Sequence, residues 1–195
     1  MNTEELIVAP LSNDLLEQAV ALCGECVGEN LYTKEMLEKA IQQQNQFFYL
    51  LLTPENKAVA YIYFTLMEIR EAERLAKNSL DRLKEIAQKR EPLIGNLQSI
   101  GVHSTYRKKQ LSKRLVKIYL NWLLDKTPAE IAFGVFWKPN GTMPMEKTLK
   151  AFGFSHLADT KRVWYDKTEL ICPVCGGRCE CDAAIYYKQL ERNLM

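Results

Sequence analysis

Hydrophobic and polar positions along the chain form two kinds of pattern, and their order predicts an α/β fold. Apolar runs typical of strands stand at residues 6–11, 46–52, 58–66, 93–103, 131–137, 162–171 and 183–189. Apolar residues at helical spacing predict helices that begin near residues 13, 33, 111 and 143. No internal repeat is visible, and 195 residues suffice for one core, so we expect a single domain.

The segment from Gln98 to Val116 combines a buried strand, a basic turn and the first turns of an amphipathic helix. A strand that leads into a helix N-terminus leaves backbone N–H groups without intrahelical partners, and the helix dipole lies behind them. Such a terminus binds phosphate. The basic side chains around it are Arg107, Lys108, Lys109, Lys113 and Arg114. The segment is therefore predicted to hold a phosphorylated ligand.

The same strand and turn resemble those of the GCN5-related N-acetyltransferase (GNAT) family. In that family a hydrophobic strand ends in a valine-like residue, here Val102, and a turn of the form (Gln/Arg)-x-x-Gly-x-(Gly/Ala) follows. This chain matches the turn at Arg107 and departs from it at Gln110 and Ser112, where the family prefers glycine, and glycine or alanine. Since the turn acts through backbone N–H groups, side chains that point away from the ligand are compatible with it.

The order of predicted elements agrees with the family over nearly the whole chain. The resemblance therefore implies one GNAT-like domain over residues 1–195, with a mixed central sheet flanked by helices on both faces. Strands 93–103 and 130–137 would be the central parallel pair that diverges around the cofactor. The implied co-substrate is acetyl-CoA and the implied acceptor is a primary amine. The implied cofactor contacts are Ile100, Val102, Arg107, Lys108, Lys109, Gln110, Leu111, Ser112, Lys113 and Asn140.

Acetyl transfer from a thioester to an amine needs a donor to the thioester oxygen, a base and an acid. By resemblance, the main-chain N–H of Val102 is the donor. The family's frequent glutamate base is replaced by Asn96, which can only orient a water, and its frequent tyrosine acid is replaced by Leu149. His103 is a substitute candidate. Proton transfer through water, or a non-catalytic acyl-CoA-binding or protein-interaction module, are the alternatives.

Residues 69–91 depart from the plain family pattern, which joins these strands by a short turn. Apolar residues at helical spacing face a charged side, so we expect an inserted amphipathic helix or helical hairpin. It would pack on its own domain, form a dimer contact, or line the acceptor site.

The composition limits the classes of partner. A formal charge of +2 makes the basic turn a local patch and argues against a dedicated nucleic-acid binder. No apolar run approaches the roughly 20 residues that cross a bilayer, and the acidic N-terminus lacks the layout of a signal peptide. We therefore expect a cytoplasmic protein that does not enter membranes.

Four cysteines lie within ten residues: Cys172, Cys175, Cys179 and Cys181. The spacing Cys-Pro-x-Cys-Gly is typical of a zinc knuckle, and a hairpin tip over residues 172–181, between the last two strands, can bring both pairs into a tetrahedral site. Disulfides and free thiols are the alternatives. A site closed by four sulfurs would stabilise the hairpin and take no part in catalysis.

The pair Cys23 and Cys26 has the spacing of a redox motif but lies within an apolar helical face. Nothing there would activate a thiolate, so we expect both thiols in the core.

Overall fold

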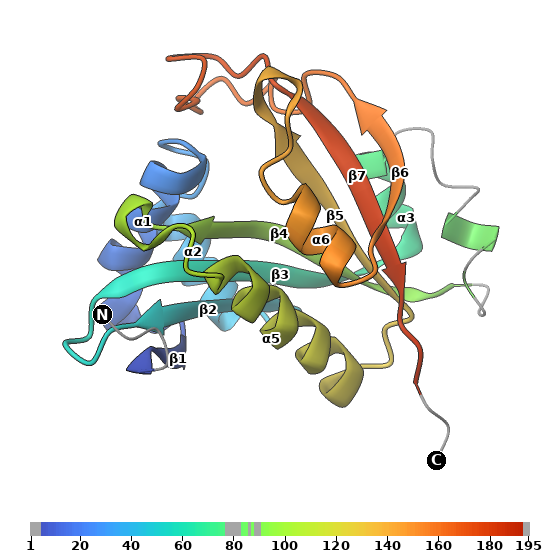
Figure 1. Cartoon of the computed structure of the whole chain (residues 1–195), viewed down its shortest axis with the longest axis horizontal. Coiled ribbons are helices and arrows are strands. Elements are labelled where there is room, and N and C mark those ends of the chain that lie inside the picture. Colours follow the sequence, from blue (N-terminus) through green and yellow to red (C-terminus); the bar gives the residue numbers. More distant parts are fainter. Residues whose placement is uncertain (1–4, 77–82, 86, 88–90, 193–195) are drawn as a thin grey trace.

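The computed structural model describes residues 5–76, 83–85, 87 and 91–192 (Figure 1). The strands are β1 (Ile7–Pro10), β2 (Gln46–Leu52), β3 (Ala58–Glu68), β4 (Leu93–Val102), β5 (Ile131–Lys138), β6 (Ser155–Thr160) and β7 (Asp182–Gln189). The helices are α1 (Leu16–Val27), α2 (Lys34–Gln42), α3 (Ile69–Ala76), α5 (Leu111–Lys126) and α6 (Glu146–Ala151).

In the described part of the chain the strands form one seven-stranded sheet in the order β1-β2-β3-β4-β5-β7-β6. Neighbouring strands are antiparallel except β4 and β5, which are parallel. The predicted mixed central sheet is thus confirmed. No helix among the described residues combines the length and apolar character that crossing a membrane requires.

Helices cover both faces of the sheet because side chains alternate along the strands (Figure 1). Tyr61 and Tyr63 of β3 pack in a cluster with α1 and α2, whereas Ile62 and Phe64 pack with α5 on the other face. All four side chains are buried, so the three aromatic residues among them fill the core. Helix α2 begins where the sequence predicts, since the Thr33 hydroxyl accepts the Met36 N–H.

Helix α3 begins the segment predicted as an insertion. Its Ile69 and Ala72, with Leu83 further along the chain, are buried in a cluster with Ile94 and Ile131 of the central strands. The described part of the segment therefore packs on its own domain. Residues 77–82, 86 and 88–90 of the predicted insertion lie outside the described residues.

The predicted strand at 162–171 is wrong, because the strand before β7 is β6 at Ser155–Thr160. Residues 162–170 form successive turns, closed by bonds such as Tyr165 N–H to Arg162 O and Leu170 N–H to Lys167 O. Charged residues at 166, 167 and 169 break the alternation that a half-buried strand needs. The four cysteines therefore lie in a long connection between β6 and β7, residues 161–181, which we call the cysteine segment.

The central strands diverge as predicted. β4 and β5 pair at three positions, Ile94 with Ile131 through Asn96 with Phe133, near the start of both strands. The pairing of β4 with β3 shifts from Ser99 to Leu97 between successive β3 residues, which leaves Gln98 as an extra residue. Such a bulge bends the strand, and here it accompanies the separation of β4 from β5.

Candidate functional site

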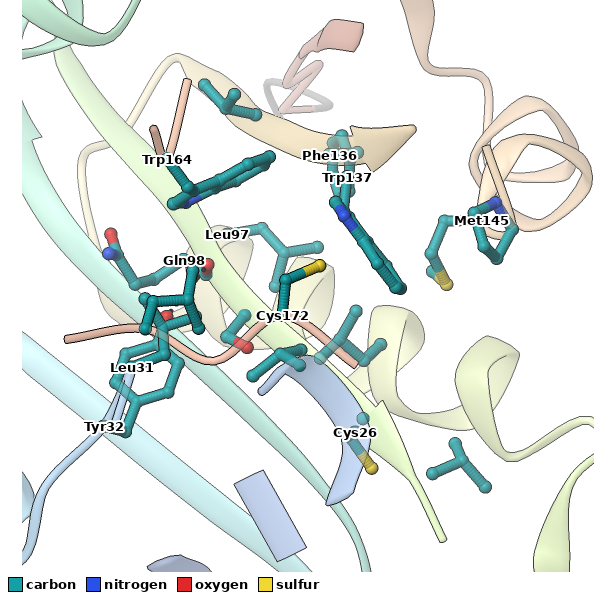
Figure 2. A pocket seen from close by; sticks show the side chains of 18 of the residues that line it. Cys26, Leu31, Tyr32, Leu97, Gln98, Phe136, Trp137, Met145, Trp164 and Cys172 are labelled. Atoms are coloured by element: carbon teal, nitrogen blue, oxygen red, sulfur yellow. Dashed lines mark hydrogen bonds between the residues drawn. The ribbon is translucent and has the colours of Figure 1, made fainter. Parts of the chain in front are cut away.

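A cavity of about 1260 Å³ lies where β4 and β5 diverge (Figure 2). Its lining comes from both sides of the sheet. One end, which we call the basic end, is lined by the turn that follows β4 and by the starts of α5 and α6. The other end, the far end, is lined by the α1–α2 connection (residues 28–33), by Leu75 of α3 and by the cysteine segment.

The start of α5 supplies backbone donors at the basic end. The amides of Lys113 and Arg114 bond back to the Gln110 oxygen, at 3.0 and 3.2 Å. The amides of Leu111 and Ser112 precede the first intrahelical bonds, and no side chain caps this helix. Both residues line the cavity, so the predicted anion-binding terminus faces it.

Two residues of this turn adopt left-handed backbone conformations without being glycine. Lys108 has φ 62° and Gln110 has φ 61°. Gln110 stands where the family prefers glycine, and the backbone here takes the shape that glycine adopts most readily. Gln110 in place of glycine therefore leaves the geometry of the turn intact, at a cost in free energy because a residue with a side chain adopts a left-handed conformation.

Two backbone N–H groups of β4 face the gap. Val102 pairs with Ala60, and the following amide, that of His103, donates to the Val59 oxygen at 2.9 Å. Val102 and Ala60 are thus a non-hydrogen-bonded pair, so the Val102 N–H points away from β3. Ile100 holds the equivalent place two residues earlier. Since β5 has diverged by this point, both N–H groups are directed to where a ligand would lie.

Cys26, at the end of α1, lines the cavity beside Val102. Burial raises the pKa of its thiol to about 11, while the Val102 N–H and the Arg107 side chain act in the lowering direction. Cys23 is 1% exposed, and burial raises its pKa to about 12. Neither thiol is activated at neutral pH. Cys23 lies in the core as predicted, whereas the place of Cys26 in the cavity wall was missed.

The basic turn is fastened to α1 by Glu25. Its carboxylate accepts the Ser104 N–H at 2.8 Å and lies 3.2 Å from Nε2 of His103. The Ser104 N–H is the main reason why the pKa of Glu25 falls below its usual value. The other ring nitrogen of His103 lies 2.9 Å from the Thr105 hydroxyl. His103 therefore joins the turn to α1 and does not line the cavity.

The position that usually holds the family's base is enclosed. Asn96 lines the cavity but is 2% exposed, and its amide donates to Oε1 of Gln98 at 2.8 Å. Leu149, at the usual acid position, is fully buried against α5. Neither side chain can transfer a proton, as the sequence predicts.

Two of the predicted cofactor contacts lie outside the cavity lining. Lys109 places its ammonium 5.1 Å from the centre of the Tyr106 ring, and Asn140 lies in a short turn after β5 with φ 50°. The structure gathers the other predicted contacts at one end of the cavity: Ile100, Val102, Arg107, Lys108, Gln110, Leu111, Ser112 and Lys113.

The far end contains aromatic and carboxylate side chains that the sequence analysis did not identify. Trp164, Asp166 and Glu169 line it from the cysteine segment. Figure 2 shows Trp164, Leu31 and Tyr32 on one side of Cys172, with Trp137 and Met145 on the other. The prediction of a strand at 162–171 did not place these residues in the cavity wall. The charged residues within 162–171 are instead typical of a loop.

Charge is unevenly distributed along the cavity. Arg107, Lys108 and Lys113 line the basic end, whereas the lining carboxylates of the described residues, Asp166 and Glu169, come from the far end together with Lys167. Such a cavity favours an anionic group of a ligand at the basic end and a cationic group, here that of a second ligand, at the far end.

The four cysteines of the cysteine segment form one cluster. Their sulfurs all lie within 4.8 Å of one another, and Sγ of Cys175 and Cys181 are 3.6 Å apart. Tetrahedral zinc with Zn–S bonds of about 2.3 Å separates its sulfurs by roughly 3.8 Å. All four are free thiols, and the left-handed Gly176 (φ 71°) closes the turn between the pairs. The residues therefore fit a four-sulfur metal site.

No protein-family model matches the sequence, and no curated protein matches it either. The structure, by contrast, is similar to solved N-acetyltransferases. NAA60 from Arabidopsis thaliana in complex with acetyl-CoA gives a TM-score of 0.72 at 11% identity, over 95% of this chain and 98% of that chain. The ribosomal-protein-S18-alanine N-acetyltransferase from Escherichia coli gives 0.64 at 12% identity, over 97% and 99%.

Naa20 from Chaetomium thermophilum, in complex with a bisubstrate analogue, gives a TM-score of 0.69 at 13% identity, over 96% of this chain and 88% of that chain. The chain has the GNAT fold. The resemblance inferred from the strand and turn is thus confirmed at the level of the fold. Within the GNAT fold, the described cavity occupies the gap between the diverging strands.

Proposed function

We propose that this protein transfers an acetyl group from acetyl-CoA to a primary amine by direct attack. The observation that carries the proposal is the cavity between β4 and β5, which joins an uncapped, basic helix N-terminus to an end lined by carboxylates. Solved structures with the same fold contain acetyl-CoA or a bisubstrate analogue, which supports the same co-substrate here.

The start of α5 would hold the pyrophosphate. The amides of Leu111 and Ser112 donate to it, and the side chains of Arg107, Lys108 and Lys113 neutralise its charge. The acyl-bearing arm then runs along the gap, where the N–H of Val102 polarises the thioester carbonyl.

The reaction needs one bond formed and one broken. The amine nitrogen attacks the thioester carbon, the C–S bond breaks, the ammonium loses a proton and the departing thiolate gains one. Asp166 and Glu169 attract the cationic amine to the far end, and we assign its deprotonation to one of them or to water, since Asn96 cannot act as a base.

The acceptors to test first are peptides with a free N-terminal amine. The Escherichia coli neighbour is named for an alanine of a ribosomal protein, and another neighbour, the NatC complex, is bound to a Gag peptide. A small-molecule amine is the other class of acceptor.

Calorimetric titration with acetyl-CoA tests the cofactor site, and micromolar binding is the expected result. Mass spectrometry of an amine panel then tests transfer, because a colorimetric thiol reagent would also react with the exposed Cys175. Absence of acetyl-CoA binding would refute the proposal. Binding without acetylation of any panel member would favour the rival, a non-catalytic acyl-CoA-binding or interaction module, to which Asn96 and Leu149 point.

We further propose that the cysteine cluster holds a structural Zn²⁺ ion. Four sulfur ligands leave no open position, so the metal would stabilise the segment and take no part in the chemistry. Elemental analysis should find about one metal ion per chain. The cytoplasmic location and the homodimer alternative for the insertion stay predictions.

A further inference from the structure

The cysteine cluster is part of the cavity wall. Cys172 and Cys179 line the cavity, and they form a buried cluster with Cys181 and Leu170. Against this cluster pack Leu31, Trp137 and Trp164. Figure 2 shows Cys172 between the Trp164 side and the Trp137 side of the cavity. The shape of the far end therefore depends on where the four sulfurs lie.

The same segment is docked on the α1–α2 connection, just beyond the end of α1. The Ile171 N–H donates to the Glu29 oxygen at 3.1 Å, and Nδ2 of Asn30 donates to the Glu169 oxygen at 3.1 Å. Gly28 allows this approach, because a Cβ there would lie 2.6 Å from the Ile171 oxygen. The α1–α2 connection and the cysteine segment thus form one continuous wall.

The sulfurs belong to a small buried core in this wall, and other contacts of the segment lie nearer the surface, among them Arg178, which donates to the Tyr165 oxygen and stacks on the Tyr165 ring. Within residues 161–181 the buried side chains are Leu170 and three of the four cysteines, Cys172, Cys179 and Cys181. A connection of this length with so small a core would gain order from a further constraint. A tetrahedral metal supplies it, because four thiolates bound to one ion fix four points of the chain.

We propose that the metal held by the four cysteines fixes the far-end wall of the cavity, so that the acceptor subsite depends on the metal and the acetyl-CoA subsite does not. The assignment of the two ends to acceptor and cofactor rests on the proposed function. The basic end is independent because α5 packs on the sheet through a separate core cluster that includes Leu111 and Leu115.

Hydrogen–deuterium exchange of the full chain tests this without knowledge of the acceptor. The zinc-loaded protein is compared with protein stripped by a chelator and with stripped protein given Zn²⁺ again. Removal of Zn²⁺ should speed amide exchange at least tenfold at Ile171, across the rest of the cysteine segment and in residues 28–33. Exchange at Lys113 and Arg114, whose amides bond to Gln110, should change less than twofold, and Zn²⁺ should restore the original pattern.

Two results would overturn the proposal. Equal protection of the segment with and without metal would show that protein contacts alone hold the wall. A loss of protection at the start of α5 as well would show that the metal stabilises the whole domain and not one end of the cavity.

Substitutions separate the metal from the docking contact. Cys175→Ser removes the exposed ligand, and Gly28→Ala blocks the approach of Ile171 while leaving the cysteines in place. Both should speed exchange of the segment, and only Cys175→Ser should also reduce metal content. Gly24→Ala is the control for an added methyl group, because a Cβ there meets its nearest atom at 3.9 Å, whereas Gly28, with φ 117°, would in addition be strained by a side chain. Wild-type exchange in Gly28→Ala would contradict the docked wall.

Acetyl-CoA titration of each form keeps the two proposals apart. Stripped protein should bind acetyl-CoA within twofold of the zinc-loaded affinity, while the KM for the best peptide of the panel rises at least tenfold. Failure of the zinc-loaded protein to bind acetyl-CoA would refute the proposed function and leave the exchange result to decide on the metal-held wall. A KM unchanged by metal removal would overturn the acceptor assignment.

Discussion

The basic turn (residues 103–113) and the cysteine segment line opposite ends of one cavity, yet they are held by different means. The turn lies between a central strand and α5, whose Leu111 and Leu115 are buried in the main core. Arg114, the next residue, also donates to the Leu6 oxygen at 2.7 Å. The cysteine segment is held by a smaller cluster, in which Leu170 and three cysteines are buried and Trp137 and Trp164 are partly buried. Position in a cavity wall therefore says nothing about how firmly a segment is fixed.

The comparison also separates two routes to a binding surface. At the basic end, the hydrogen-bond donors are backbone N–H groups, which any sequence that forms this turn would present. The basic side chains there set only the local charge. At the far end, the surface consists of side chains on a segment of little regular structure. The first kind tolerates substitutions such as Gln110 for glycine, whereas the second depends on a few contacts, such as Asn30 with Glu169.

The largest expected effect contrasts the hydrophobic anchors of the two regions. Leu115→Ala should lower the free energy of unfolding by about 2–5 kcal/mol, because it leaves a cavity in the main core. Leu170→Ala should cost less than Leu115→Ala in zinc-loaded protein, because Leu170 is buried in the smaller cluster of the cysteine segment. Urea denaturation measures both. Equal costs would remove the distinction between the two regions.

Charge reversal at the basic end comes next. Ser112→Glu places a carboxylate beside the first amides of α5 and should weaken acetyl-CoA binding roughly a hundredfold, about 2.7 kcal/mol, by repulsion of the pyrophosphate. Ser112→Ala, which removes only the contact with the Thr148 hydroxyl, is the control and should change the affinity little. Calorimetry gives both values, and unchanged affinity of Ser112→Glu would place the cofactor elsewhere.

A smaller effect tests the conformational cost of the basic turn. Gln110→Gly should raise the free energy of unfolding by about 0.5–1 kcal/mol, because relief of the left-handed conformation exceeds the added freedom of the unfolded chain. Gln110→Ala keeps the same strain and should bring no gain. Destabilisation by glycine would instead show that the contact between Gln110 and Lys113 contributes more than the strain costs.

The smallest effect concerns pH and the anchor between the turn and α1. The Ser104 N–H lowers the pKa of Glu25 in the folded protein. The ionised Glu25 carboxylate therefore adds to the free energy of unfolding above the ordinary carboxyl pKa of 4.5, and this contribution is lost as the pH falls through the lower folded-state pKa. The difference in Tm between wild type and Glu25→Gln should therefore shrink below pH 4.5. Thermal melts from pH 3 to 6 check this, and a constant difference would exclude the anchor.

Prediction from sequence succeeded wherever the signal was local. The strand at 58–66, the helix start near residue 33 and the strand, turn and helix around Val102 are short patterns, and each was found where expected. The four cysteines were also predicted to cluster, since they lie within ten residues. The missed strand at 155–160 shows the limit, because its alternation is weak and a more apolar stretch at 162–171 competed with it.

The role of individual residues required the arrangement of distant segments. His103 stands beside the predicted site along the chain, yet Glu25, far earlier in the sequence, draws it to α1 and away from the cavity lining. Cys26 belongs to an apolar helical face, yet the end of α1 places it beside Val102.

The order of predicted elements, together with the family resemblance of the strand and basic turn, was thus enough to predict the fold and the basic end of the cavity, because these patterns arise from neighbours in sequence. The residues that line the far end of the cavity could not be predicted from such local patterns. Its wall joins residues 28–33 to the cysteine segment, and the bond between Asn30 and Glu169 spans 139 positions. Nothing in the pattern around either residue indicates the other. Such a contact exists only after the sheet has brought the end of α1 and the β6–β7 connection together.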